Sequence, residues 1–168
     1  MPDASKIFSG PATVLIGDVG GDYTNVGYTR GGVNITKSRD TRPIEADQSM
    51  YPLHIAITSE GYEIDLRLLE TTYANLQLGW GEPGGSPATL SGAKLGMSSG
   101  ASPVYKKIKI YGNRKDGTQV SWEFPKCMQT GFGAYAFSKD DEALIEFTLT
   151  ALWDDAEGCI GAFCPATG

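Results

Sequence analysis

The chain has 168 residues, of which 20 are acidic and 14 are basic, giving a net charge of −6. This acid excess argues against tight binding of nucleic acid, because such binding requires clustered Lys and Arg. The length suits one domain with its own core, here residues 1–168. The 22 glycines are roughly double the average share of ~7%. With many turn signals and no long apolar helical period, this composition predicts an all-β fold.

Targeting signals and cysteines give expectations about location. Met1 precedes a polar segment, and no run reaches the ~18 apolar residues of a membrane span, so we expect neither a signal peptide nor a membrane segment. The cysteines are Cys127, Cys159 and Cys164. Their odd number predicts free thiols in a reducing cytoplasm, with a Cys159–Cys164 bridge as the alternative.

The N-terminal third predicts an arm followed by short strands. Residues 1–10 are expected to form an N-terminal arm, and residues 12–16 a short apolar strand. Strands at 23–29 and 32–38 flank a glycine turn at 30–32. Residues 39–50 are polar and contain Pro43, so we expect a loop or an irregular edge there.

Residues 53–68 predict two alternating strands joined by a turn at Glu60 and Gly61, since glycine tolerates the positive φ of tight turns. Successive strand residues face opposite sides of a sheet. The second strand therefore buries one side and exposes Glu63, Asp65 and Arg67 on the other.

A single helix is expected after this strand. Thr71 or Thr72 offers a hydroxyl N-cap, and Gly79 offers a left-handed C-terminal end. The predicted apolar stripe of the helix consists of Leu69, Tyr73 and Leu76.

The segment that follows, residues 81–102, contains thirteen Gly, Ser or Pro residues in 22 positions. A long segment without periodicity is usually functional or disordered, so we expect a loop that orders against a neighbouring subunit.

The last third predicts further strands. These are 104–111, 118–124 after a turn at 113–117, 132–137, and 144–153 after a charged turn at 139–142. The side chains expected inside the last strand are Ile145, Phe147, Leu149, Ala151 and Trp153. Trp122 and Phe137 are also expected in the core, and residues 155–168 in a C-terminal arm.

The chain offers little for catalysis or metal binding. His54 is the only histidine, so His-based zinc sites and Ser-His-Asp networks lack their components. We therefore expect no catalytic residue, no metal site and no cofactor. Two alternatives stay open: a hydrolase using Glu63 and Asp65 as an acid/base pair, and a carbohydrate-binding module that stacks sugars on Tyr105 or Tyr111.

Several segments together resemble the major tail tube proteins of long-tailed bacteriophages. They are 31–33 (GGV), 44–48 (IEADQ), 52–58 (PLHIAIT), 62–78 (YEIDLRLLETTYANLQL) and 144–154 (LIEFTLTALWD). These segments lie within residues 13–80 and 144–154, which together cover about half of the chain, and the most telling is 62–78. The 81–102 loop and the tail after Asp154 have no counterpart in the resemblance.

The resemblance implies a β-sandwich or partly closed barrel with one helix, an extended loop and terminal arms. Copies would form hexameric rings that stack helically into a tube, through which double-stranded DNA passes without specific binding. Further implied partners are a tape measure, a tail terminator, and a baseplate or tail tip. The implied location is the virion tail, and the host cytoplasm before assembly. Another virion ring, at the neck or tail terminus, is the related alternative.

The resemblance also suggests roles for individual residues. Glu63, Asp65 and Arg67 would face the lumen. The candidate inter-ring contacts, taken from the N-terminal arm and the long loop, are Lys6, Phe8, Pro83, Lys94 and Met97.

Overall fold

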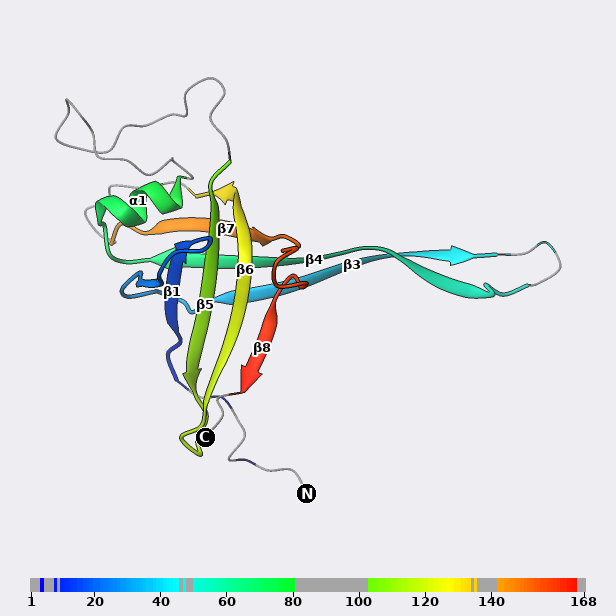
Figure 1. Cartoon of the computed structure of the whole chain (residues 1–168), viewed down its shortest axis with the longest axis horizontal. Coiled ribbons are helices and arrows are strands. Elements are labelled where there is room, and N and C mark those ends of the chain that lie inside the picture. The colour runs from blue at the N-terminus through cyan, green and yellow to red at the C-terminus, as the bar shows by residue number, and fades with distance from the viewer. Residues whose placement is uncertain are drawn as a thin grey trace.

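A computed structural model describes residues 4, 8, 10–45, 47, 50–80, 103–133, 135 and 142–165. Within these residues the fold is almost entirely antiparallel β-sheet with one short helix, as the sequence predicted (Figure 1). The elements are β1 (Thr13–Asp18), β2 (Thr24–Asn25), β3 (Asn34–Ile44), β4 (His54–Leu68), α1 (Tyr73–Gly79), β5 (Tyr105–Asn113), β6 (Gln119–Phe132), β7 (Ile145–Ala151) and β8 (Ala162–Pro165).

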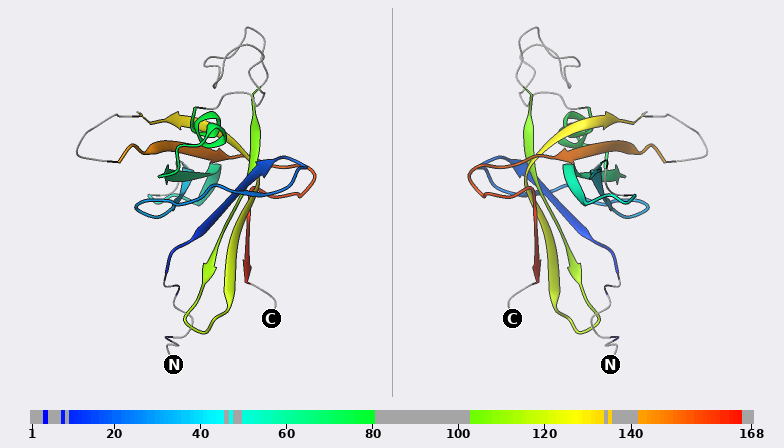
Figure 2. Two further views of the ribbon diagram at one scale, coloured as in Figure 1. Left: turned by 90° about the vertical axis from the view of Figure 1, so that its left-hand side faces the viewer. Right: turned by 90° about the vertical axis from the view of Figure 1, so that its right-hand side faces the viewer.

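The strands form one sheet that folds over on itself. Their order is β2-β1-β5-β6-β7-β4-β3, and β8 pairs with β6. The long strand β6 belongs to both layers: residues 119–128 pair with β5, residues 120–123 also pair with β8, and residues 127–132 pair with β7. The result is a sandwich-like fold that does not close into a barrel, because β2 and β3 are the two ends of the order. Figure 2 shows the lower parts of β5, β6 and β8 diverging from the layer that contains β4 and β7.

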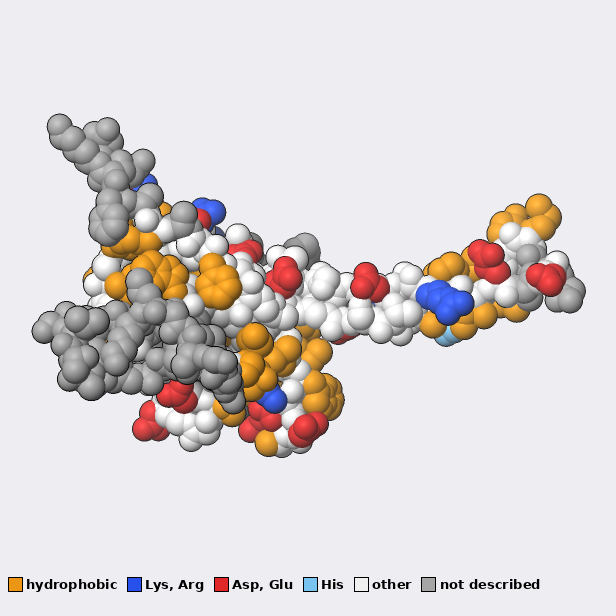
Figure 3. Space-filling view, turned by 90° about the horizontal axis from the view of Figure 1, so that it is seen from above, with side chains coloured by type: hydrophobic (Ala, Val, Ile, Leu, Met, Phe, Trp, Pro, Cys, Tyr) orange, Lys and Arg blue, Asp and Glu red, His pale blue; other side chains and the backbone are white. Residues whose placement is uncertain are grey.

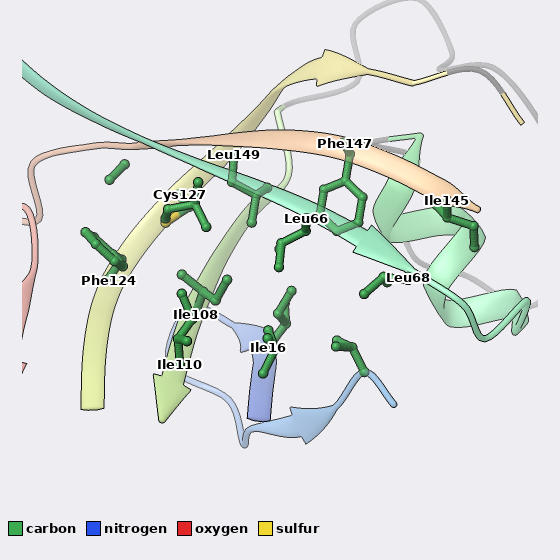
Figure 4. Packing of buried hydrophobic residues seen from close by; sticks show 14 residues of the cluster. Ile16, Leu66, Leu68, Ile108, Ile110, Phe124, Cys127, Ile145, Phe147 and Leu149 are labelled. Atoms are coloured by element: carbon green, nitrogen blue, oxygen red, sulfur yellow. The ribbon is translucent and has the colours of Figure 1, made fainter. Parts of the chain in front are cut away.

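The core lies between the two layers. Its buried side chains come from β1, β4, β5, β6 and β7, with Val26 from the segment after β2 (Figure 4). Along β1, β4, β5 and β7 they occupy every second position, as period-two alternation requires. The largest fully buried side chains are Phe124, Ile64, Leu66, Leu68, Ile108, Leu149, Val14 and Cys127. All three cysteines are free thiols, and burial raises the pKa of the Cys127 thiol to about 12. Cys127 is therefore a core residue rather than a reactive nucleophile.

The hairpin of β3 and β4 is longer than the sequence indicated. The predicted turn at Glu60 and Gly61 is wrong, because β4 continues through both residues, which pair with Arg39 and Ser38 of β3. Of the two alternatives predicted for 39–50, the loop is wrong for 39–44, which complete β3. The irregular edge fits, because β3 ends the strand order and its register shifts between Asp40 and Thr41. Pro43 fits an edge strand, where its missing N–H leaves no ladder bond unmade. The outer part of this hairpin, residues 39–45, 47 and 50–60, projects from the body and is called the arm below (Figure 1).

The helix begins as predicted but packs differently. The Thr72 hydroxyl accepts a hydrogen bond from the Asn75 amide at 3.1 Å. The buried residues of the helix are Asn75 and Gly79. Of the predicted apolar stripe, Leu76 is partly buried against the core, whereas Tyr73 is exposed. Asn75 Nδ2 donates to the carbonyl oxygen of Val26 at 3.0 Å and thereby ties α1 to the segment after β2. Gly79 is the last helical residue and lacks positive φ, so its predicted left-handed role is wrong; Trp80 is the C-cap.

Other boundaries also moved. The predicted strand at 23–29 reduces to β2 and a bridge between Thr29 and Leu68, whereas the glycine turn at 30–32 is present with positive φ at Gly31 and Gly32. The strand predicted at 118–124 continues to Phe132 as β6. Of the separate strand predicted at 132–137, only Phe132 belongs to a strand, and Phe137 lies outside the described residues. β8 lies within the segment expected to be a C-terminal arm.

β7 confirms four of its five predicted core residues. Ile145, Phe147, Leu149 and Ala151 are buried, but Trp153 is exposed because the strand ends at Ala151. The Trp153 indole N–H donates to Asp155 at 3.0 Å. In the part of the chain that the structure describes, no helix is long and apolar enough to cross a membrane.

We predict that Gly79→Ala destabilises the fold. A Cβ at Gly79 would overlap the side chain of Ile145, because α1 packs directly on β7 there. Such overpacking costs about 1–3 kcal/mol and outweighs the ~1 kcal/mol that alanine gains over glycine in a helix. Urea denaturation measures the difference. Gly21→Ala is the matched control, since a Cβ there has its nearest neighbour at an ordinary 3.5 Å. Equal stability of the two variants would contradict the packing argument.

Candidate functional site: the polar face of the β3–β4–β7 layer

The alternation of β4 separates a buried side from a charged side, as predicted. Ile64, Leu66 and Leu68 point into the core and are at most 1% exposed. Glu63, Asp65 and Arg67 share the opposite, exposed face. The structure therefore brings the three candidate lumen residues together on one surface.

Neighbouring strands extend this surface with small polar side chains. Residues directly opposite each other in a ladder lie on the same face of the sheet. The surface, called the polar face below, consists of Asn34 and Thr36 from β3, Glu63, Asp65 and Arg67 from β4, Thr130 from β6, and Glu146, Thr148 and Thr150 from β7. Figure 1 shows β3, β4 and β7, which carry most of this surface, running side by side.

The charges on the polar face are partly neutralised. Thr148 Oγ1 donates to Asp65 Oδ1 at 2.6 Å, and Arg67 Nε lies 3.1 Å from Glu146 Oε1. Together with Glu63, the polar face carries three carboxylates against one guanidinium, a net charge of −2. A surface of this kind repels phosphate groups over a distance of about one Debye length, ~8 Å at physiological salt.

A shallow hollow of about 260 Å³ lies at the end of the polar face near the 30–32 turn. Asp65, Arg67 and Glu146 line this hollow, but Glu63 does not. A glycosidase needs two carboxylates that flank one substrate bond. Since only one member of the Glu63–Asp65 pair reaches the hollow, the geometry gives the hydrolase alternative no support.

The proposed aromatic platform receives equally little support. Tyr105 is partly exposed, but the Lys126 ammonium lies 4.9 Å from the centre of its ring. Tyr111 is half-buried and lines a different hollow. Among the described residues no group of three or more His, Cys, Asp or Glu side chains is placed to hold a metal ion.

Of the candidate inter-ring residues, only Phe8 can be placed. It pairs with Arg114 in an isolated bridge, and its ring lies against Gly112 of β5. Lys6, Pro83, Lys94 and Met97 lie outside the described residues.

Two apolar surfaces of the molecule were not predicted from the sequence. One is on the arm, where Ile55 and Ile57 are 61% and 56% exposed. The other is a groove at the lower end of the sandwich, which includes Trp122 and Phe163. The prediction that Trp122 lies in the core is therefore wrong, since this side chain is exposed in the groove. The alternation of Ile55 and Ile57 predicted a strand, but alternation alone does not show whether its apolar side is buried or exposed. Phe163 carried no signal, because β8 is recognised only through its pairing with β6.

We predict that the ion pair on the polar face contributes little to folding. Arg67→Ala and Glu146→Ala should each lower the free energy of unfolding by less than about 1 kcal/mol, because exposed pairs are solvated and screened. A double-mutant cycle should give a coupling of about 0.2–1 kcal/mol. Leu66→Ala, on the buried side of the same strand, should cost about 2–5 kcal/mol. A coupling above about 2 kcal/mol would mean that this face is part of the folding core.

Comparisons with known proteins find a solved structure with a similar fold, but they do not assign this chain to a family. No protein-family model and no curated protein sequence matches this chain. A solved structure does resemble it: a chain in the cryo-EM structure of the anti-feeding prophage baseplate, which is 6-fold symmetrised. The TM-score is 0.52 at 8% sequence identity, and the match covers 94% of this chain and 95% of the other. At this identity the similarity shows a shared fold across nearly the whole length of both chains.

Proposed function

We propose that this chain is a structural subunit of a phage-type tail. In this proposal its copies form hexameric rings that stack into a tail tube, and double-stranded DNA passes through the tube without specific binding. The chain acts as a building block rather than a catalyst. Its partners are further copies of itself and the proteins at the two ends and in the interior of the tube: a terminator, a baseplate or tail tip, and a tape measure. Its place is the virion tail, after synthesis in the host cytoplasm.

The open edge of the sheet at β3 carries the proposal. This strand of 11 residues pairs with β4 on one side, and within the described residues its other side has no strand partner. Such an edge presents a row of unpaired N–H and C=O groups, which a monomer has to blunt and an assembly can pair with a neighbour. A head-to-tail contact between identical subunits closes into a ring when the rotation allows it.

Two further observations support it. The polar face carries a net charge of −2 and is lined by threonine hydroxyls, which suits a surface that DNA passes without adhering. The fold is also shared, over 94% of this chain, with a component of a prophage baseplate reconstructed with six-fold symmetry. Ring closure by six copies is the natural extension of that symmetry to this chain.

A second candidate is a ring that stays single, as part of a baseplate or at the end of a tube. It is favoured by the source of the structural neighbour, which is itself a baseplate. The two candidates share the ring and differ only in whether rings stack.

Electron microscopy of the purified full chain tests the proposal. We predict hollow tubes with a regular ring repeat and six-fold rotational symmetry in end views. Isolated rings would select the second candidate. A protein that stays monomeric at high concentration, by both microscopy and sedimentation, would refute both.

A labelling experiment tests which face lines the channel. The variant is Glu63→Cys in a Cys159→Ser, Cys164→Ser background; buried Cys127, with its thiol pKa of about 12, stays unreactive. We predict that a maleimide on a polymer too large for the channel labels free subunits but not tubes. A small maleimide should label both. Labelling of tubes by the polymer maleimide would mean that the polar face lies on the outside of the tube. If neither maleimide labels tubes, the polar face is buried between subunits.

A further inference from the structure

The arm carries an apolar strip on the same side of the hairpin as the core. Along β3, Ile35 packs on the core, and alternation places Thr41 and Pro43 on that same side. Their partners across the ladder are Ile57 and Ile55. The strip (Pro43, Ile55 and Ile57) thus continues the core side of the sheet into solvent, turned progressively by strand twist.

A β-bulge sets this arrangement. Asp40 pairs with Ser59 but Thr41 pairs with Ile57, so Thr58 is an extra residue in β4. Between the bulge and the body lies an ion-pair cluster, in which Glu60 contacts Lys37 at 2.8 Å and Arg39 at 2.6 Å. Hydrogen bonds from Lys37 and then Arg39 hold the pKa of Glu60 below its ordinary value. The strip is therefore an isolated apolar surface and not a frayed edge of the core.

The strip cannot be covered by its own groove while the hairpin is paired. Pro43 lies eight residues beyond Ile35, which corresponds to about 26 Å at ~3.3 Å per residue. Ile35 itself lines the groove. Figure 1 shows the arm extending away from the body, and Figure 3 shows hydrophobic side chains gathered along its outer part. Such a patch on a projecting element is typical of an interaction site.

The groove offers a matching surface on the body. It has a volume of about 260 Å³, and the side chains that define it are Phe8, Val33, Ile35, Ile110, Trp122 and Phe163. Trp122 and Phe163 stack with ring centres 4.9 Å apart, yet they remain 39% and 45% exposed. An apolar cavity of ~150 Å³ accommodates a benzene ring, so the groove has room for an isoleucine side chain.

The charges around the two surfaces are opposite in sign. The tip of the arm carries Glu45 and Asp47 and no basic residue between positions 43 and 53. Arg114 lines the groove, and Lys115 and Asp116 follow it in the turn between β5 and β6, so this end of the groove carries a net charge of +1. Complementary charges of this kind orient two proteins as they meet.

From this complementarity we infer that the arm of one copy docks in the groove of a second copy. The apolar strip fills the space beside Trp122 and Phe163, and the acidic tip lies against Arg114 and Lys115. The inference rests on the proposed self-assembly and names the surfaces that make it. Because the arm and the groove are different surfaces, each copy gives one contact and receives another, so the association is head-to-tail.

Complementation between two variants of the full chain tests the inference. Ile55→Ser with Ile57→Ser removes the strip, and Phe163→Ser removes one wall of the groove. Each variant alone should self-associate about 100-fold or more weakly than the wild type, measured by sedimentation velocity. Mixed, they should form a 1:1 complex that grows no further, since one intact arm and one intact groove remain.

Ile44→Ser is the matched control. Ile44 is 48% exposed on the same arm, but it pairs with His54 on the opposite face, so this variant should associate like the wild type. Arg114→Glu is the second groove variant in case Phe163→Ser fails to fold; it should weaken association about 10-fold, with a smaller salt dependence. Circular dichroism and thermal melting establish that each variant is folded.

Three results would overturn the inference without contradicting the proposed function. The strip variant could form tubes or rings at the same concentration as the wild type, or Ile44→Ser could weaken self-association as much as the strip variant does. The third result is that the two folded variants form no 1:1 complex when they are mixed. Self-association of the Phe163→Ser variant at full strength would instead indicate contact between two arms and would also overturn it. A wild-type chain that stays monomeric refutes the proposed function itself.

Discussion

The alternation of one strand, β4, is the constraint on which the rest of this structure depends. Its inward residues Ile64, Leu66 and Leu68 anchor the core, and hydrophobic burial of three such side chains stabilises the fold by several kcal/mol. The same backbone fixes Glu63, Asp65 and Arg67 on the other side. A one-residue slip of this strand would therefore bury the charges and expose the core, so register and surface chemistry are set together.

The shape of the sheet follows from the unequal lengths of its strands. β6 is long enough to pair in both layers, so the layers are joined through it but diverge at their lower ends. This divergence leaves the groove uncovered, while the length of β3 and β4 beyond their partners produces the arm. The arm and the groove thus both lie where a strand extends beyond the strands with which it pairs. Edges and overhangs are costly for a monomer and useful for a polymer.

Local patterns in the sequence were enough for the elements whose signals are local. The alternation in β4 and β7, the N-cap at Thr72 and the glycine turn at 30–32 were predicted from neighbouring residues alone. The prediction failed where distant pairing overrides a local signal. Gly61 indicated a turn, but it pairs with Ser38, and the strand predicted to end at residue 124 continues to Phe132. The three charged residues of β4 on the polar face were therefore predictable, whereas the rest of that face, the arm and the groove required the pairings between strands.

The bulge at Thr58 has a consequence for how such a chain can vary over time. Substitutions on the arm alter one contact each, and many of them should be tolerated. Removing Thr58 would abolish the bulge but leave Ile57 opposite Thr41 and Ile55 opposite Pro43, so the apolar strip would keep its side of the hairpin. A deletion of one residue at this point should therefore be tolerated among natural variants as readily as a substitution.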